Sequence, residues 1–236
     1  MNYGIGYYLC NPKLQHPMNE LLLIIVAYLI GSVPTAVWVS KRFFGIDIRD
    51  YGSGNAGATN TYRVLGKKWG TIVMSVDVIK GICATSLYIF LPHYVLPTSE
   101  LHRTNFMIGL GLAAVLGHVF PIWAGFKGGK GVATLFGMAI AIQPVVAVCC
   151  VAVFLLVLYL TRFVSLSSIL AGISFMVFIL FIFNEKEPLY RIFAIIVALM
   201  IVLTHQKNIT RILKGTESKV PILKYRDRRR GRKRSN

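Results

Sequence analysis

The run from residue 131 to residue 160, GVATLFGMAIAIQPVVAVCCVAVFLLVLYL, decides the fold, because it can cross a membrane once or twice. It is apolar almost throughout and is interrupted at Gln143-Pro144. A single helix here would give the chain six crossings. Since proline breaks the helical hydrogen-bond ladder, a turn at this point would give seven. The arm before the turn, roughly twelve residues, is too short to cross fully at ~1.5 Å per residue, so we expect it to lie buried among other helices.

Apolar runs of membrane-spanning length occur in the rest of the chain as well. Hydrophobic residues make up 55% of the sequence and charged residues 15%, and the mean hydropathy is +0.62. A soluble domain of this size would need more polar surface, whereas a helix of ~20 apolar residues crosses a bilayer core. We therefore predict an all-α integral membrane protein. The further runs, of which the last two are short for a span, are 21–40, 71–91, 105–123, 168–183 and 192–204.

The distribution of positive charge indicates which side faces the cytoplasm. The chain has 26 Lys and Arg against 9 Asp and Glu, a net charge of +17, and it is most basic after His205. A basic tail after a last span is more typical of a cytoplasmic end near anionic lipids than of nucleic-acid binding. With seven transmembrane helices, an external N-terminus and a cytoplasmic C-terminus, 21 of the 26 cations lie inside. Because this is the positive-inside pattern, we predict that topology. The cations outside are then Lys13, Arg103, Lys186 and Arg191.

The sequence predicts one membrane domain with two flanking segments. We expect an N-terminal extension at 1–17, a single polytopic domain at 18–219 and a basic cytoplasmic tail at 220–236, with Met18 as an alternative start. The spacing of the cysteines fits neither a disulfide framework nor a zinc site, so we expect no metal. The oligomeric state stays open. The cysteines are Cys10, Cys83, Cys149 and Cys150.

The first of four polar segments, residues 45–63, has the composition of a phosphate-binding loop. Its glycines follow the GxGxxG spacing, but no strand precedes them, which argues against a dinucleotide-binding fold. Glycines let backbone N–H groups approach an anion, a helix starting near Asn55 would favour phosphate further, and an arginine can clamp it with two parallel bonds. A flexible polar loop is the alternative. The candidate residues are Gly52, Ser53, Gly54, Asn55, Gly57, Thr59, Asn60 and Arg63.

The second segment, residues 117–131, also combines glycines with cations. It is not a Walker A loop, because that pattern needs Gly at position 124 and Ser or Thr at position 131. We expect it to offer bare backbone and two positive charges to an anion. His118 ends a span, where a packing role and a functional role are equally possible. The candidate residues are Lys127, Gly128, Gly129 and Lys130.

The third and fourth segments, residues 162–168 and 205–217, place polar side chains at the ends of spans. Ser165 and the serines after it fit a helix N-cap, a ligand contact or both. If the fourth segment is helical, His205 and Asn208 are three residues apart and share a face. A solvated basic face explains the Lys and Arg of this segment better than it explains His205 and Asn208.

Two ionisable residues, Asp77 and Lys80, lie inside the apolar run 71–91. Ionisable groups in lipid are costly and are usually paired or functional. A structural ion pair and a catalytic pair are both possible here.

Taken together, these segments resemble the bacterial acyl-phosphate:glycerol-3-phosphate acyltransferase family, PlsY. The resemblance covers about residues 21–219, and the N-terminal extension and basic tail depart from it without touching the motifs. The combination of Ser53–Asn60 with Phe126–Thr134 is highly specific, whereas any one segment alone is not. In family order, the matching stretches are 31–34, 52–63, Asp77-x-x-Lys80-Gly81, 117–134, 165–168 and 205–217.

The resemblance implies a reaction and a location. The family transfers a fatty acyl group from a long-chain acyl phosphate to the 1-hydroxyl of glycerol 3-phosphate, giving lysophosphatidic acid and phosphate. It implies seven helices in the bacterial cytoplasmic (inner) membrane, surrounded by membrane lipids, with the active site facing the cytoplasm. We expect no cofactor and no nucleic-acid partner.

The resemblance also implies residue roles. Ser53 and Arg63 would hold the acyl phosphate, with the intervening Gly-rich backbone as its cradle, and His205 would complete the catalytic set. Asp77, Lys80 and Glu217 would be structural. The glycerol 3-phosphate contacts would be Lys127, Ser165, His205 and Asn208.

The identity of the base and the class of function leave alternatives. A substrate phosphate oxygen or His205 could take the hydroxyl proton, and no Ser-His-Asp triad is required because acyl phosphate is already activated. A membrane transporter for an organic phosphate would also use broken helices and Gly-rich loops, although such sites usually lie at the midplane between repeats and no repeat is visible here. An acyltransferase that uses acyl-CoA is a third reading.

Overall fold

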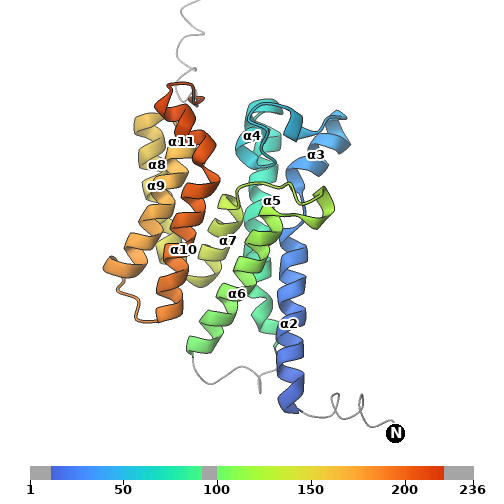
Figure 1. The fold of residues 1–236 in the computed structure, drawn as a ribbon, viewed down its shortest axis with the longest axis vertical. Helices are drawn as coiled ribbons and strands as arrows, with labels where there is room; N and C mark the ends of the chain where they lie inside the picture. The colour runs from blue at the N-terminus through green and yellow to red at the C-terminus, as the bar shows by residue number, and fades with distance from the viewer. Residues whose placement is uncertain (1–11, 92–99, 221–236) are drawn as a thin grey trace, which may run out of the picture. The chain divides into compact units, whose positions relative to one another are not determined.

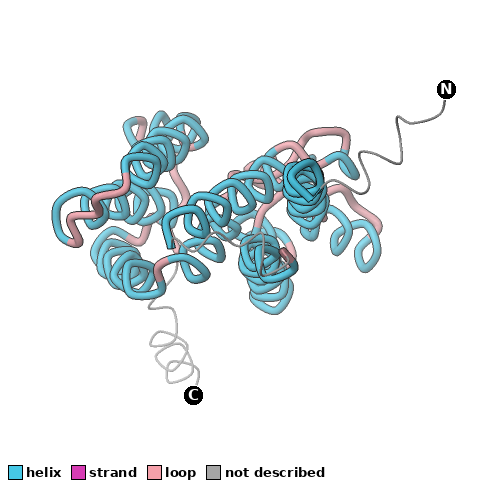
Figure 2. The backbone as a smooth tube through the Cα atoms, turned by 90° about the horizontal axis from the view of Figure 1, so that it is seen from below, coloured by secondary structure: helices cyan, strands magenta, loops and turns pink. Residues whose placement is uncertain are grey.

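The computed structural model of the chain describes residues 12–91 and 100–220, with only the backbone described at 12–17 and 100–102. These ranges contain helices, turns and loops but no strand (Figure 2), which confirms the all-α prediction for the described residues. The predicted extension up to residue 11 and the predicted tail from residue 221 lie outside them. The chain divides into two compact units. Unit 1 comprises the residues up to Ala147 with Glu185–Phe193, and unit 2 comprises Val148–Asn184 with the residues from Ala194 onward.

Unit 1 is a helical bundle in which α2 packs along α6 and α5 packs along α7 (Figure 1). Short helices carry the polar segments between the long ones. The helices of unit 1 are α2 (Pro12–Gly31), α3 (Thr35–Phe44), η1 (Ile48–Asp50), α4 (Ala58–Val64), α5 (Lys67–Thr85), η2 (Ser86–Phe90), α6 (Glu100–Val119), η3 (Ile122–Ala124) and α7 (Val132–Ile142).

Glycines let the long helices of unit 1 approach closely. A methyl group added to Gly117 on α6 would collide with the backbone of α2, and one added to Gly31 on α2 would collide with the backbone of Ala114. Gly81 of α5 and Gly137 of α7 meet each other's helices in the same way. Crossings through small residues are typical of membrane helices, which pack by close backbone approach.

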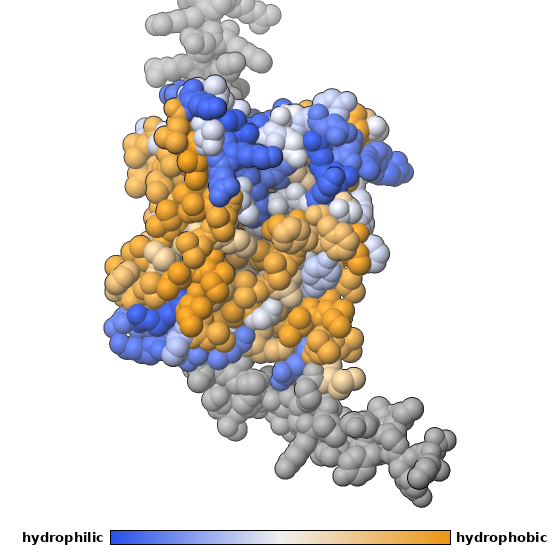
Figure 3. All heavy atoms as spheres, in the orientation of Figure 1, coloured by the Kyte–Doolittle hydropathy of each residue, from blue (hydrophilic) through white to orange (hydrophobic). Residues whose placement is uncertain are grey.

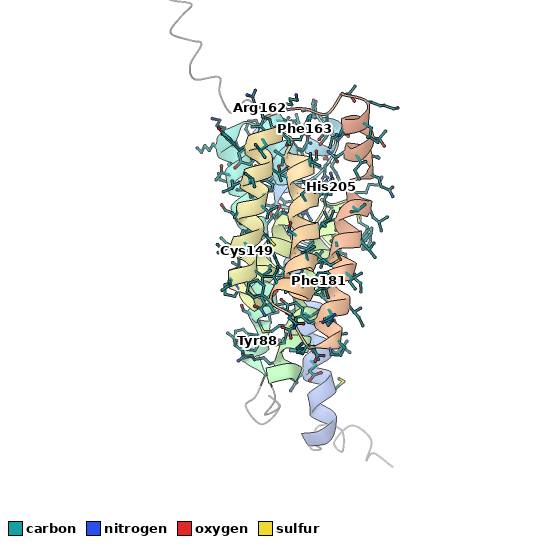
Figure 4. The ribbon with its side chains drawn as sticks, turned by 90° about the vertical axis from the view of Figure 1, so that its left-hand side faces the viewer. Tyr88, Cys149, Arg162, Phe163, Phe181 and His205 are labelled. Atoms are coloured by element: carbon teal, nitrogen blue, oxygen red, sulfur yellow. The ribbon has the colours of Figure 1, made fainter. Side chains whose placement is uncertain are left out.

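Unit 2 is built from helices whose polar ends are brought to one side of the unit. In Figure 4, Arg162 and Phe163 at the start of α9 and His205 at the end of α10 lie toward the same end, whereas Phe181 lies toward the other. The first residues of α8 and α10 belong to unit 1. The helices are α8 (Pro144–Thr161), α9 (Val164–Val177), the π-helical turn η4 (Phe178–Ile182), α10 (Pro188–Thr204) and α11 (Gln206–Leu213).

Within the described residues, five helices are long and apolar enough to cross a membrane, and six are if α10 and α11 form one bent span. With 11 residues, α7 is too short to cross alone at ~1.5 Å per residue, as predicted for the arm before Gln143. Counting α7 would give seven, so the number seven and the orientation of the termini stay predictions. Figure 3 shows apolar side chains along the helix flanks of each unit and polar ones at helix ends.

Three breaks lie within or at the end of the apolar runs, and the sequence analysis placed a break inside a run only at Gln143-Pro144. Because α7 ends at Ile142 and α8 starts at Pro144, the predicted break at Gln143-Pro144 is confirmed and a continuous helix through this run is excluded. The run 21–40 is divided between α2 and α3 ahead of Pro34, which has no N–H to continue the ladder. A third break, at His205, bends α11 by 56° from α10.

Candidate active site

Asn60 holds the Gly-rich segment of unit 1 in shape. Its side chain is almost fully buried at the start of α4. Its Oδ1 accepts the backbone N–H of Ser53 at 2.8 Å, and its Nδ2 donates to the carbonyl oxygens of Ile48 at 3.0 Å and Tyr51 at 2.9 Å. Both amide hydrogens are therefore used by the loop, so Asn60 positions the loop, and a direct contact between Asn60 and a substrate stays a prediction.

Two glycines make this loop conformation possible. Gly52 and Gly54 adopt φ values of 62° and 72°, the left-handed region that favours glycine. At Gly52 a Cβ atom would also collide with Oδ1 of Asn60. The loop therefore depends on Gly52 for space as well as for conformation.

The following backbone is available to an anion. From Asn55 to Thr59, the N–H groups form no hydrogen bond to any other described residue, because α4 begins only at Ala58 and its N-cap Gly57 has no capping side chain. The predicted helix start near Asn55 is thus three residues early. Ser53 and Thr59 are half-buried beside these groups, and Arg63 is exposed in the last turn of α4. A run of unpaired N–H groups of this kind is an anion-binding cradle.

Arg49 connects the first two polar segments, and the sequence reading missed it. Its Nε and Nη2 donate to the two oxygens of Asp47 at 2.9 and 2.7 Å. Its Nη1 donates to the carbonyl oxygens of Ala124 at 2.8 Å and Lys127 at 3.3 Å. Hydrogen bonds from Arg49 hold the pKa of Asp47 well below its ordinary value, so this carboxylate stays charged. The Asp47–Arg49 pair therefore keeps its bonds to the Ala124 and Lys127 carbonyl oxygens, and we call it the Arg49 clamp.

Between the two segments lies a polar cleft of about 590 Å³ in unit 1. Lys127 is exposed on its lining, beside the Arg49 clamp and the Gly-rich loop. The lining residues are Asp47, Arg49, Asp50, Gly54, Ala124, Gly125, Lys127 and Gly128.

The glycines of the second segment fold back on α6 and do not offer the bare backbone that the sequence suggested. Gly128 N–H donates to the Val119 carbonyl oxygen and Gly129 N–H to that of His118, both at 3.1 Å. A Cβ atom on Gly129 would collide with Nε2 of the His118 ring. The expectation of bare backbone is therefore wrong at these two glycines, because their N–H groups close the turn that presents Lys127.

Beneath this turn, Asp77 and Lys80 form the predicted ion pair, 2.8 Å apart and both buried. Asp77 Oδ1 also accepts the hydroxyl of Thr35 at 3.2 Å and lies 3.6 Å from Nδ1 of His118. Lys80 also donates to the carbonyl oxygen of Val33 at 3.0 Å, which takes up a backbone group freed by the break between α2 and α3. The pair thus joins α5 to three other parts of unit 1, which is a structural arrangement.

In unit 2, Glu217 gathers the third and fourth segments. Its Oε1 accepts the hydroxyl of Ser165 at 2.8 Å and Nδ2 of Asn208 at 2.7 Å, and its Oε2 accepts Nε of Arg211 at 2.6 Å. Burial alone would raise the pKa of Glu217, but these hydrogen bonds outweigh it and hold the pKa below its ordinary value. A buried, charged carboxylate therefore orients two predicted substrate contacts.

The serines after Phe163 do not cap α9, so that interpretation is wrong. Phe163 is the N-cap residue and provides no side-chain bond. Ser167 and Ser168 donate to the carbonyl oxygens four residues earlier in the chain, at 2.8 and 2.9 Å. Of the three serines, only Ser165 donates its hydroxyl to Glu217, which distinguishes it from Ser167 and Ser168.

His205 is buried at the corner between α10 and α11, where it is the N-cap residue of α11. Its Nδ1 lies 2.8 Å from the carbonyl oxygen of Ile201. Because a carbonyl can only accept, Nδ1 carries a proton in this bond, and whenever the ring is neutral its lone pair is on Nε2. Asn208 follows one turn later and donates its backbone N–H to the His205 carbonyl oxygen at 2.9 Å. The two residues therefore lie one turn apart, as the helical interpretation of this segment predicted.

The predicted residues thus fall into two groups. The first two segments meet in unit 1 around Asn60 and Arg49, and the last two meet in unit 2 around Glu217. Lys130 is half-buried just before α7. The described residues contain no group of three or more His, Cys, Asp or Glu that could hold a metal ion.

Comparison with known proteins decides the family. The glycerol-3-phosphate acyltransferase family model matches residues 21–215. The chain belongs to the glycerol-3-phosphate acyltransferase family. It is an integral membrane acyltransferase, and the transporter interpretation is not favoured.

Relatives in this family span nearly the whole chain. A glycerol-3-phosphate acyltransferase of Fusobacterium nucleatum is 43% identical over 202 residues, which cover 86% of this chain and 98% of the relative. One of Chlorobium limicola is 41% identical over 233 residues, covering 88% and 99%. One of Bacillus velezensis is 44% identical over 199 residues, covering 84% and 96%.

Two solved structures of the family are also similar to this chain. Both are crystal structures of PlsY (YgiH), an integral membrane glycerol 3-phosphate acyltransferase, and both are 38% identical to it. The glycerol 3-phosphate form has a TM-score of 0.75 and covers 86% of this chain and 96% of its own. The lysophosphatidic acid form has a TM-score of 0.71, with 85% and 95% covered.

Proposed function

We propose that this chain transfers a fatty acyl group from acyl phosphate to the 1-hydroxyl of glycerol 3-phosphate, releasing lysophosphatidic acid and inorganic phosphate. The reaction takes place at the cytoplasmic face of a bacterial inner membrane, in a protein of seven transmembrane helices with its N-terminus outside. The acceptor and product are those of the PlsY structures that it resembles. The orientation is supported by the positive-inside distribution of Lys and Arg.

The observation that carries the proposal is the run of N–H groups without described partners from Asn55 to Thr59, fixed by Asn60. A phosphate that accepts hydrogen bonds from this backbone lies beside the Ser53 hydroxyl, and Arg63 at the end of α4 adds a positive charge. In this proposal the loop is the acyl phosphate cradle, the role that the family resemblance implies for it.

The second phosphate belongs to glycerol 3-phosphate. In unit 1 the cleft presents the Lys127 ammonium group for it. In unit 2, Ser165 and Asn208 are oriented by Glu217, and His205 lies one turn before Asn208. The family resemblance, and not the placement of the two units, is what joins these four residues as proposed contacts; within unit 2, Glu217 orients two of them.

In the reaction, the oxygen of the 1-hydroxyl forms a bond to the carbonyl carbon of the acyl phosphate, and the bond from that carbon to the phosphate oxygen breaks. Phosphate is a good leaving group, so positioning of the hydroxyl and stabilisation of the developing charge supply most of the catalysis. The hydroxyl proton passes to a phosphate oxygen of the substrate. His205 is the competing base, because its ring in the neutral form, with Nδ1 bonded to the Ile201 carbonyl oxygen, carries its lone pair on Nε2.

His205→Gln separates the two bases. If a substrate phosphate takes the proton, the folded variant keeps appreciable turnover. If His205 is the base, turnover is abolished while the melting temperature in detergent stays near that of the unaltered protein. The measurement is the initial rate of acyl transfer at saturating concentrations of both substrates.

The acceptor is tested by supplying the purified, detergent-solubilised protein with palmitoyl phosphate, with and without glycerol 3-phosphate. We expect lysophosphatidic acid, identified by mass spectrometry, only when both substrates are present, and none from Arg63→Ala. Folded protein that forms no lysophosphatidic acid from palmitoyl phosphate or palmitoyl-CoA would contradict the proposal. Uptake of glycerol 3-phosphate into vesicles would then be measured for the transporter alternative.

A further inference from the structure

A patch on unit 1 combines exposed cations with aromatic rings. It is formed by the end of α3 and the start of α5, through Arg42, Phe43, Phe44, Lys67, Lys68 and Trp69, which we call the α3–α5 patch. The Trp69 ring lies 4.5 Å from that of Phe43 and 5.5 Å from that of Phe44, between ring centres. Phe43 is 59% exposed and Phe44 is 42% exposed, so this cluster packs at the surface and not in the core.

The cations of the patch are placed over its rings. The Arg42 guanidinium lies 5.9 Å from the centre of the Phe43 ring, and the Lys68 ammonium lies 5.5 Å from that of Trp69. A cation at this distance from a ring is attracted by the negative face of the ring, so the rings hold both charges near the aromatic surface.

Within the described part of the chain, these charges are not neutralised by ion pairs. The neighbouring Lys41 forms an ion pair with Asp47 at 3.2 Å, and Asp47 is also the partner of Arg49. Among the described residues, Arg42, Lys67 and Lys68 have no ion-pair partner, and all three are exposed. The patch therefore presents about three uncompensated positive charges to its surroundings.

The patch lies at the ends of two candidate membrane spans, which is the depth of the lipid headgroups if these helices cross the bilayer. One candidate membrane span ends at Phe44, and another begins at Lys67. Figure 3 shows the polar surface around α3 and α4 directly beside the apolar helix flanks of unit 1. Aromatic side chains favour this depth, with the ring near the acyl chains and the polar neighbours among the headgroups.

We propose that the α3–α5 patch is a binding site for the phosphate headgroup of an anionic phospholipid. Arg42 and Lys68 bind the phosphate, Lys67 adds to the attraction, and the rings of Phe43, Phe44 and Trp69 contact the first part of the acyl chains. The occupant is a lipid of the surrounding leaflet and not a soluble phosphate, because the rings need an apolar neighbour that a soluble phosphate does not provide. The site is independent of the transfer reaction.

The experiment uses quenching of Trp69 fluorescence by brominated lipids. The full chain carrying Trp38→Phe and Trp123→Phe is reconstituted into vesicles containing either brominated phosphatidylglycerol or brominated phosphatidylcholine. Trp69 is then the only tryptophan, and the ratio of the two quenching curves reports which lipid is preferred beside it. We expect a preference of several-fold for phosphatidylglycerol at low salt, since each cation near a membrane surface contributes about a fivefold factor.

The charge of the patch is then changed against a matched control. Arg42→Gln with Lys68→Gln should lower the several-fold preference to near one, whereas Lys186→Gln with Lys207→Gln removes two exposed charges elsewhere and should leave it unchanged. Raising the salt to about 1 M should lower the preference of the unaltered patch, because the Debye length falls to ~3 Å.

Three results would overturn the proposal. One is equal quenching by both lipids at low salt, and another is a preference that the patch variant retains. The third is loss of the preference when inorganic phosphate is added at constant ionic strength, because the occupant would then be a soluble phosphate. The salt series needs no charge substitution, so the proposal stays testable if the patch variant fails to fold.

Discussion

At the scale of single residues, three carboxylates or amides hold the polar segments, and each bonds several partners at once. Asn60 bonds three groups of the Gly-rich loop, and Glu217 bonds three side chains of unit 2. Asp47 bonds both Arg49 and Lys41. Because each of these residues fixes a segment from within, replacing it should displace the predicted substrate contacts that the segment carries.

Replacing Glu217 should change both stability and its dependence on pH. We expect Glu217→Gln to lower the free energy of unfolding by about 1–3 kcal/mol at pH 7, since the charged bond to Arg211 is lost. Because the folded pKa of Glu217 is depressed, its contribution is present above the ordinary value of 4.5 and is lost as the pH falls through the lower folded value. Thermal unfolding in detergent between pH 7 and pH 3 measures this.

The difference in stability between the two proteins should therefore be constant from pH 7 to about pH 5 and should shrink below it. A difference that grows on acidification would mean that the carboxyl group is protonated in the folded protein at neutral pH. That result would contradict a charged Glu217 carboxylate that accepts hydrogen bonds from Ser165, Asn208 and Arg211.

Replacing Arg49 should weaken the presentation of Lys127. A lysine cannot supply the two parallel bonds to Asp47 and the bonds across to Ala124 and Lys127. We expect Arg49→Lys to lower kcat/KM for glycerol 3-phosphate about tenfold or more, mainly through KM. The matched control is Arg42→Lys, whose guanidinium makes no side-chain hydrogen bond to a described residue; an equal fall in the two variants would contradict the clamp.

Sequence reasoning singled out the polar residues of the four segments, among them Glu217, which positions two others, but it missed Arg49. Ser53 stood out in a Gly-rich loop, Asn208 at the end of a span, and Glu217 through the family resemblance. Arg49 did not, since its partners are the carbonyl oxygens of residues 124 and 127, and backbone positions in a distant loop cannot be inferred from residue type. The hydrogen bonds of the Gly128 and Gly129 N–H groups to carbonyl oxygens of α6 were missed for the same reason.

At the scale of helices, the crossing of α2 and α6 provides a test with an internal control. Gly117 and Gly109 both lie on α6, but an added methyl group would collide with the backbone of α2 at Gly117 and would meet nothing at Gly109. We expect Gly117→Ala to lower the free energy of unfolding by about 1–3 kcal/mol or more, because two backbones must separate. Gly109→Ala should be neutral or slightly stabilising, since alanine favours helix.

The measurement is the unfolding of both variants in mixed detergent micelles, followed by circular dichroism. Equal effects at the two positions would contradict the close crossing of α2 and α6.

Helix breaks were predictable only where the sequence marks them inside an otherwise uniform run. Pro144 follows the polar Gln143 in the middle of apolar sequence, so the break between α7 and α8 was expected. The break ahead of Pro34 and the bend at His205 depend on tertiary partners as well. The Val33 carbonyl oxygen is taken up by Lys80, and the His205 ring bonds the Ile201 carbonyl oxygen.

At the scale of the whole molecule, the proposed topology places the loop before α10 outside and the start of α11 in the cytoplasm. Cysteines introduced as Lys186→Cys and Lys207→Cys, each in a background whose native cysteines are replaced by alanine, test this. Both positions are exposed. In intact spheroplasts, a membrane-impermeant maleimide should label position 186 and not position 207. Labelling of both positions only after lysis, or of position 207 in intact spheroplasts, would contradict the proposed sidedness.

Hydropathy predicts the fold class because the bilayer imposes one requirement on every residue of a span, namely that its backbone be paired within the segment. It does not predict the number of crossings as firmly, because an 11-residue helix such as α7 can be apolar without crossing. The pairing of the polar segments within each unit depends on side-chain bonds such as that of Ser165 to Glu217, fifty-two residues apart, and needs the structure.

The stoichiometry of the leaving group tests whether the donor held in the Gly-rich cradle is an acyl phosphate. Purified protein is given glycerol 3-phosphate with palmitoyl phosphate or with palmitoyl-CoA, and lysophosphatidic acid, inorganic phosphate and free CoA are measured together. We predict equal amounts of phosphate and lysophosphatidic acid from palmitoyl phosphate, loss of both in Arg63→Ala, and no transfer from palmitoyl-CoA. Transfer from palmitoyl-CoA with release of free CoA, and none from palmitoyl phosphate, would contradict this prediction.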